Sequence, residues 1–232
     1  MKILRCVKLN FLQWRINPKY FICLLFVVLD IWYMLHGIQN YAQHLGYGVR
    51  PYILALLPGA NGHYMIVLFI SILLVSDAPF CNGQQQFILL RIGKRNWMAG
   101  QLLYLFCVSA LYISFLWILS VIFLLPNISF GKTWGHVIQT AAQKQDYFTF
   151  APAISISYNC IKNVTPAEAM LWFMGMFLAV HFLLSEIVLL CNLWTKGGVG
   201  TVIAMCFILI TYLIRQLSAY TGFQRFLIWI SP

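Results

Sequence analysis

Long apolar runs dominate this sequence, and their length constrains the fold more than any other feature. The five runs cover residues 20–36, 62–80, 97–125, 167–193 and 199–215. An α-helix rises about 1.5 Å per residue, so about 20 apolar residues cross the hydrocarbon core of a bilayer. We therefore predict an all-α integral membrane protein in which residues 1–232 form a single transmembrane domain with five spanning helices.

The composition supports the membrane assignment. Hydrophobic residues make up 62% of the chain and charged residues only 9%, whereas soluble domains carry about 25% charged residues. The net charge of +10 is not a nucleic-acid signal, because the bases lie in short segments beside apolar runs rather than on a polar module. We expect a multi-pass protein of the cell (plasma) membrane that contacts the lipid bilayer and no nucleic acid.

The distribution of basic residues predicts how the spans are oriented. The stretch before the first run holds five bases and the loop at 77–96 holds three, whereas the loop at 37–63 holds one. The longer loop at 126–166 holds three bases. Because cytoplasmic loops carry an excess of Lys and Arg, we predict a cytoplasmic N-terminus and an external loop at 126–166. For the loop between the fourth and fifth runs, the prediction of a cytoplasmic location depends on a single residue, Lys196.

The polar segment at residues 81–96 interrupts the apolar pattern. Pro79 and Gly83 end the second run, and the sequence QQQFILLRI at 84–92 predicts a short amphipathic helix that Gly93 ends. Trp97 marks the membrane surface where the third run begins. A helix of this kind can lie on the lipid surface or fit a groove on a cytoplasmic partner.

The run from Ser76 to Phe106 resembles the membrane subunit of type-2 ABC transporters, most of which are exporters. The matching stretches are DAPF at 77–80, QFILLRIGKR at 86–95 and GQ at 100–101. In that family a cytoplasmic coupling helix between the second and third spans sits on a separate ATPase subunit. The resemblance implies a bacterial exporter-like permease with the ATPase-coupling residues Gln86, Phe87, Leu90, Arg91, Gly93, Lys94 and Arg95.

The function that the resemblance implies is export of a peptide or lipid-like substrate. An ABC ATPase subunit would dock on the helix at 84–95, and a second permease would complete a homo- or heterodimer. The chain differs from the family in two places. Glutamines stand at 84–86 where the family commonly has a glutamate, and the five runs are one fewer than the six spans of the family, so the last span is missing or incomplete.

No motif in the sequence supports catalysis. There is no GxxxxGK[ST] phosphate loop and no Cys or His spacing typical of a metal site. We therefore expect no enzyme activity, no cofactor, and ATP hydrolysis in a separate partner chain. Two alternatives stay open, namely a non-transporting membrane interaction, immunity or assembly protein, and an enzyme that acts on lipids.

Two acids within the apolar runs, Asp30 and Glu186, are candidate intramembrane polar residues. Ionisable groups at that depth are costly and often functional. Asp30 could contact a substrate or a proton, or could form a hydrogen bond between helices, and Glu186 could hold two helices together. Asp77 lies near the predicted cytoplasmic surface, where water, Arg91 or Lys94 could satisfy its charge.

Two further pieces of the chain have open interpretations. Residues 52–57 are apolar but too short to cross a bilayer, and they precede the turn signal PGANG, so they lie at the interface or re-enter. The external loop at 126–166 is rich in aromatic residues. These could form a lid over an exit path or a helix that rests on lipid headgroups.

Overall fold

The computed structural model of this chain describes residues 2–15, 17–79, 89, 91–125, 127–143, 147–150, 154–195 and 198–221. The described residues fold almost entirely into helices, as the apolar runs predict. The α-helices and 3-10 helices (η) are α1 (Lys2–Leu12), η1 (Gln13–Arg15), α2 (Lys19–Leu45), η2 (Ile53–Gly59), α3 (Asn61–Val75), α5 (Lys94–Leu124), α6 (Gly135–Gln143), α7 (Tyr147–Phe150), α8 (Tyr158–Asn163), α9 (Pro166–Trp194) and α10 (Val199–Thr221).

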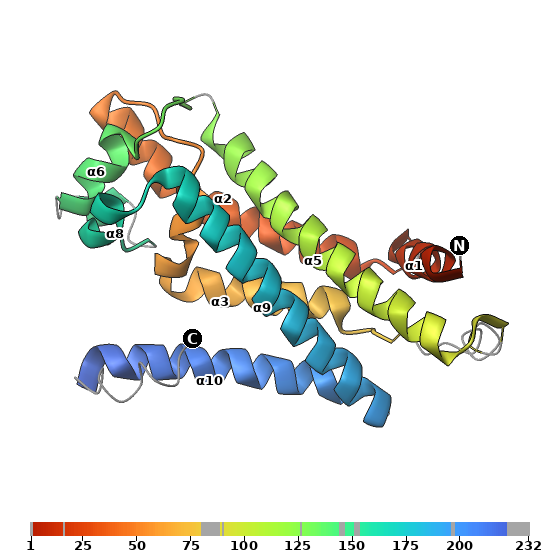
Figure 1. Cartoon of the computed structure of the whole chain (residues 1–232). Coiled ribbons are helices and arrows are strands. Elements are labelled where there is room, and N and C mark those ends of the chain that lie inside the picture. The colour runs from red at the N-terminus through yellow and green to blue at the C-terminus, as the bar shows by residue number, and fades with distance from the viewer. Residues whose placement is uncertain are drawn as a thin grey trace.

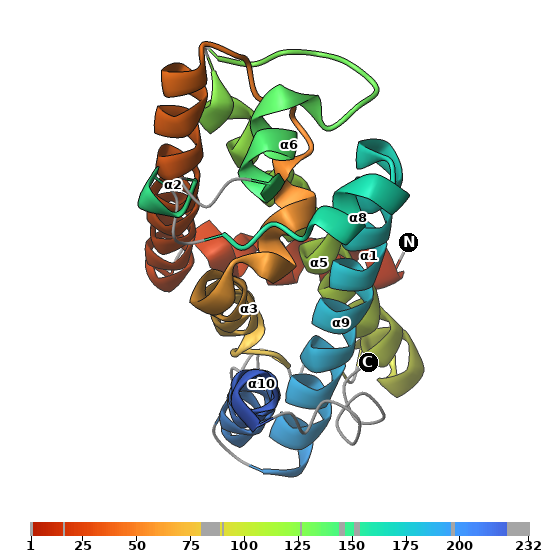
Figure 2. The ribbon, with the colours of Figure 1, turned by 90° about the vertical axis from the view of Figure 1, so that its left-hand side faces the viewer.

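Four of these helices are long and apolar enough to cross a membrane: α2, α5, α9 and α10. A fifth candidate consists of η2 and α3, which meet at an angle of 100° and count as one broken span or a re-entrant segment. The prediction of a helical multi-pass membrane protein is thus confirmed, with four spans or five if the bent pair is counted. Helices α2, α5 and α9 form the body of the bundle, and α10 packs on α9 and α3 (Figures 1 and 2).

Two helices have different ends from those that the apolar runs predict. The first run ends at residue 36, but α2 continues to Leu45, where Gly46 adopts a left-handed φ of +72° and closes the helix. The second run extends to residue 80, but α3 ends at Val75. The hydroxyl of Ser76 then donates to the Leu73 carbonyl at 2.9 Å, and the turn that follows holds residues 76–79 outside any helix.

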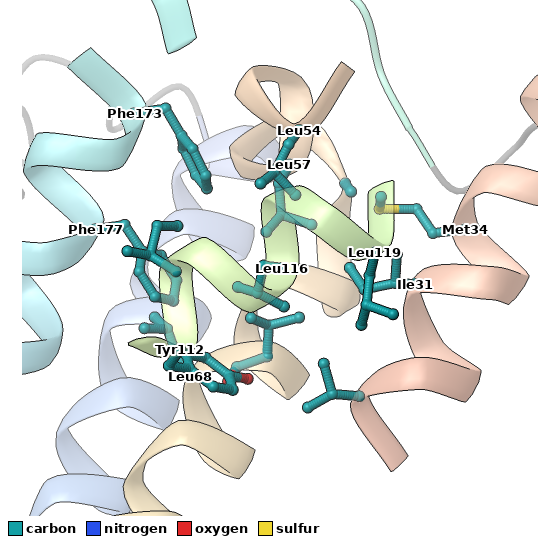
Figure 3. Packing of buried hydrophobic residues seen from close by; sticks show 14 of the residues in the cluster. Ile31, Met34, Leu54, Leu57, Leu68, Tyr112, Leu116, Leu119, Phe173 and Phe177 are labelled. Carbon is teal, nitrogen blue, oxygen red and sulfur yellow. The ribbon is translucent and has the colours of Figure 1, made fainter. Parts of the chain in front are cut away.

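The core of the bundle lies around α5, which contacts α2, α3, α9 and η2. Tyr112, Leu116 and Leu119 of α5 project toward side chains from all four of these elements (Figure 3). Their neighbours in the cluster are Ile31 and Met34 of α2, Leu54 and Leu57 of η2, Leu68 of α3, and Phe173 and Phe177 of α9. Since α5 is central, its position fixes the positions of the other helices.

The two pieces with open interpretations differ in burial. Ile53, Leu54 and Leu57 of η2 are fully buried, so residues 52–57 pack inside the bundle, as part of a broken span or as a re-entrant segment. In the loop at 126–166, Trp134 and Tyr147 are also buried, and the Trp134 indole donates to the Val164 carbonyl at 2.8 Å. Phe130 and Tyr158 of the same loop are exposed, so both interpretations of its aromatic residues stay open.

Replacement of Leu116 by alanine tests the central role of α5. Leu116 is fully buried, so Leu116→Ala should lower the free energy of unfolding by about 3 kcal/mol, through lost contacts and an unfilled cavity. The measurement is thermal unfolding of the purified chain in detergent. Leu111→Ala is the matched control on the same helix, because Leu111 is 56% exposed, and an equal loss in both variants would contradict this assignment of the core.

Candidate functional site

Polar side chains gather around the turn after α3, at the end of the bundle where α1 lies. Asp77 in this turn accepts from two residues at the start of α2, with Lys19 Nζ at 2.9 Å from Oδ1 and Tyr20 Oη at 3.2 Å from Oδ2. Lys19 also donates to the hydroxyl of Ser76. Among the described residues, the side chains that pair with Asp77 are thus Lys19 and Tyr20, and not Arg91 or Lys94.

Helices α9 and α10 join the same turn through one asparagine. The amide nitrogen of Asn192, near the end of α9, donates to the carbonyls of Ser76 at 3.2 Å and Ala78 at 2.7 Å. Its amide oxygen accepts from the backbone N–H of Gly200 in α10 at 2.9 Å. One side chain therefore connects α9, α10 and the turn. We call Lys19, Tyr20, Ser76, Asp77, Ala78 and Asn192 the Asp77 cluster.

Helix α1 packs against the first turns of α5, where the polar segment returns to the bundle. Asn10 donates to the side-chain oxygen of Gln101 at 3.0 Å, and both residues are buried. A Cβ atom on Gly100 would lie 2.8 Å from the Cβ of Cys6, so only glycine lets the two helices approach this closely. After α1, the Trp14 indole donates to the Tyr104 hydroxyl at 2.8 Å.

The structure describes four of the seven predicted ATPase-coupling residues. Arg91 is helical, Gly93 has a φ of +86° and precedes the start of α5, and Lys94 and Arg95 lie in its first turn. All four are exposed. Gln86, Phe87 and Leu90 lie outside the described residues, as does most of the predicted helix at 84–92.

The two intramembrane acids have different surroundings. Asp30 Oδ1 lies 2.7 Å from Nδ1 of His63 in α3, so Asp30 forms a hydrogen bond between two helices. Glu186 in α9 is half-buried, and no hydrogen bond joins it to another residue of the described ranges. The structure thus pairs Asp30 with a histidine and not with the other acid.

Sequence reasoning missed the residues that complete these sites, namely His63, Tyr20 and Asn192. Each is a common polar residue with no motif around it, and each is more than thirty positions from its partner. His63 was the one that could have been found, since a histidine at the start of an apolar run is a natural partner for an acid within another run.

Comparisons of the chain with protein-family models, with curated proteins and with solved structures give no match.

Asn192→Ala tests the connection between α9, α10 and the turn after α3. The change leaves two backbone carbonyls and one N–H without their partner, so we expect a loss of about 2 kcal/mol in the free energy of unfolding. Thermal unfolding in detergent measures it. The control is Asn96→Ala, at an exposed asparagine that donates to the Ile92 carbonyl, where a change within about 0.5 kcal/mol is expected.

Gly100→Val tests the packing of α1 against α5. In the wild type, burial raises the pKa of the Cys6 thiol, so little thiolate forms near neutral pH and alkylation is slow. Displacement of α1 by the valine should expose Cys6 and raise its rate of alkylation about tenfold or more, in a chain whose other cysteines are replaced by alanine. Gly175→Val is the control, since a Cβ there meets nothing within 4 Å. Unchanged alkylation in Gly100→Val would contradict this packing.

Proposed function

We propose that this chain is the permease subunit of an ABC transporter that exports a peptide or lipid-like substrate across the cell membrane. One observation carries the proposal. The polar segment between α3 and α5 continues at both ends into sites that hold several helices together. The Asp77 cluster lies before it, and the contact of α1 with Gly100 and Gln101 lies after it.

This arrangement suits a segment that receives force from a partner protein. A push on residues 84–95 would act on the turn at 76–78, which hydrogen bonds connect to α2, α9 and α10. It would also act on the start of α5, against which α1 packs. Motion of the segment would thus reach five helices through direct bonds, which is the contiguous network that mechanical coupling between sites requires.

The charges near this segment suit a cytoplasmic surface. Arg91, Lys94 and Arg95 are exposed at the end of this segment, and Arg5 and Lys8 are exposed on α1. Such a group of bases supports a cytoplasmic location for this end of the bundle, and it offers contacts for acidic groups of an ATPase subunit.

The exposed side of α10 supports the proposed second permease. In the apolar 18-residue stretch of α10, only 22% is buried, whereas 39–44% of the corresponding stretches of α2, α5 and α9 is buried. Val202, Phe207 and Ile210 are among its exposed apolar residues. A second permease subunit packed on this side would enclose an apolar path, which fits a peptide or lipid-like substrate that enters from the bilayer.

Arg91→Glu tests the proposal. The chain is purified in mild detergent from its native host, and the proteins that accompany it are identified by mass spectrometry. We expect a stoichiometric ABC ATPase with the wild type. Because charge reversal at an interface costs several kcal/mol, the variant should retain less than about a tenth of it. Lys132→Glu, the same change on an exposed lysine of the loop at 126–166, should retain all of it.

A wild-type chain that purifies alone, or with a partner that lacks a nucleotide site, would overturn the proposal. The remaining candidate would then be a non-transporting membrane interaction protein, with residues 84–95 on the lipid surface. Equal loss of the ATPase in Arg91→Glu and Lys132→Glu would also count against docking at this segment, since only Arg91 lies in it.

A further inference from the structure

An aspartate and a histidine meet in the interior of the bundle, far from both ends of α2. Asp30 Oδ1 and His63 Nδ1 are 2.7 Å apart, and the two side chains are only 10% and 16% exposed. Asp30 lies eleven residues after Lys19, the first residue of α2, which is about 16 Å along the helix. That is about half of a hydrocarbon core of about 30 Å, so the pair lies near the middle of the membrane.

The pair lies beside the break between η2 and α3. His63 is in the first turn of α3, immediately after the 100° bend. The carbonyl of Gly59, at the end of η2, accepts from the backbone N–H and the hydroxyl of Ser155 at 3.0 and 2.8 Å. A segment of the loop at 126–166 thus holds the break in place. Breaks of this kind allow one half of a span to move relative to the other.

The second carboxyl oxygen of Asp30 has no hydrogen-bond partner among the described residues. This oxygen, Oδ2, is buried. A negative oxygen without a partner is very costly in a hydrocarbon environment. No metal ion or ammonium group can reach this oxygen unless the helices move apart, because almost none of its surface is accessible. A proton needs no additional space, so it is the ligand that suits this oxygen.

The groups around the pair do not supply the missing charge. Tyr33 of α2 packs its ring against His63, with the centroids 5.7 Å apart. Tyr112 of α5 interacts electrostatically with Asp30, and its hydroxyl donates to the Val67 carbonyl. The next residue of α3, Tyr64, interacts electrostatically with Arg215 of α10. His181 of α9 contacts Ser109 and the Ser71 carbonyl instead. A phenol carries no positive charge, and the cation among these groups, Arg215, acts on Tyr64.

We propose that Asp30 and His63 form a proton-binding site in the middle of the membrane. With one exchangeable proton the pair is neutral overall, as a carboxylic acid with a neutral imidazole or as a carboxylate with an imidazolium. Release of that proton to water leaves one negative charge in the apolar interior. Because this charge is tolerated only where water enters, proton release requires the first turn of α3 to separate from α2. The site goes beyond the proposed function and needs no ATPase partner.

The test is an infrared titration of the full chain in lipid nanodiscs. The carboxylic-acid C=O band of Asp30 should appear in the wild type, disappear in Asp30→Asn and remain in Asp77→Asn, the matched control. The asparagine keeps the shape of Asp30 and cannot titrate. In His63→Gln the pH midpoint of the band should move by one unit or more, a change of about tenfold in proton concentration.

A second measurement keeps the proposal testable if either variant fails to fold. Nitrogen NMR follows the imidazoles in a chain in which the three exposed histidines, His36, His44 and His136, are replaced by glutamine. The signal of His63 should change at the pH midpoint of the carboxyl band, because the two groups share the proton. Absence of an Asp30 band at every pH at which the chain stays folded would overturn the proposal, as would a band that His63→Gln leaves unchanged or a His63 signal with a separate midpoint.

Discussion

Inside a bilayer no water is available to hydrogen-bond with a polar group, and this lack of solvent explains how the helices and polar residues of this chain are arranged. Backbone N–H and C=O groups must find partners within the chain, which favours continuous helices such as α2, α5 and α9. The same constraint acts on side chains. His181 is fully buried, donates from Nε2 to the Ser71 carbonyl, and has Nδ1 2.7 Å from the Ser109 hydroxyl. Polar residues in the interior therefore occur in pairs and clusters, and these connect particular helices to each other.

The break between η2 and α3 is the place where the bundle departs from continuous helices. Irregular backbone at membrane depth is tolerated only where protein surrounds it, and here η2 is buried among α3, α5 and α9. Ser155, in the loop at 126–166, donates from its hydroxyl to the Gly59 carbonyl at the break. Asp30, one of the two intramembrane acids, lies beside this break. Irregular backbone and an ionisable pair at the same depth make this region the most distinctive part of the interior.

The two sites lie at different depths and have different chemistry. The Asp77 cluster joins four segments at the end of the bundle through a salt bridge and amide hydrogen bonds, which suits the transfer of force. The Asp30–His63 pair involves only α2 and α3 and can change its charge. Both include α2 and α3, since Lys19 and Asp77 connect the ends of the same two helices. A change in the angle between α2 and α3 would therefore affect both sites.

The class of protein, the position of most spans and the polar segment between the second and third spans could be predicted from the sequence. Hydropathy and charge are local properties, so runs such as 97–125 and 167–193 identified α5 and α9 directly. Asp30 also stood out, because an acid within an apolar run is conspicuous. The extension of α2 to Leu45 was missed, since residues 37–45 are more polar and the helix continues beyond the apolar run.

Which polar groups meet depends on how the helices pack. His63 as the partner of Asp30, Lys19 as the partner of Asp77, and Asn192 as the connection to α9 and α10 all depend on how the helices are rotated and at what depth they cross. A run of apolar residues contains little information on rotation, because most of its faces look alike. Helix packing at positions such as Gly100 and Gly200, where a Cβ would clash, fixes the rotation. Pairing therefore follows from the fit between helices, which no local pattern records.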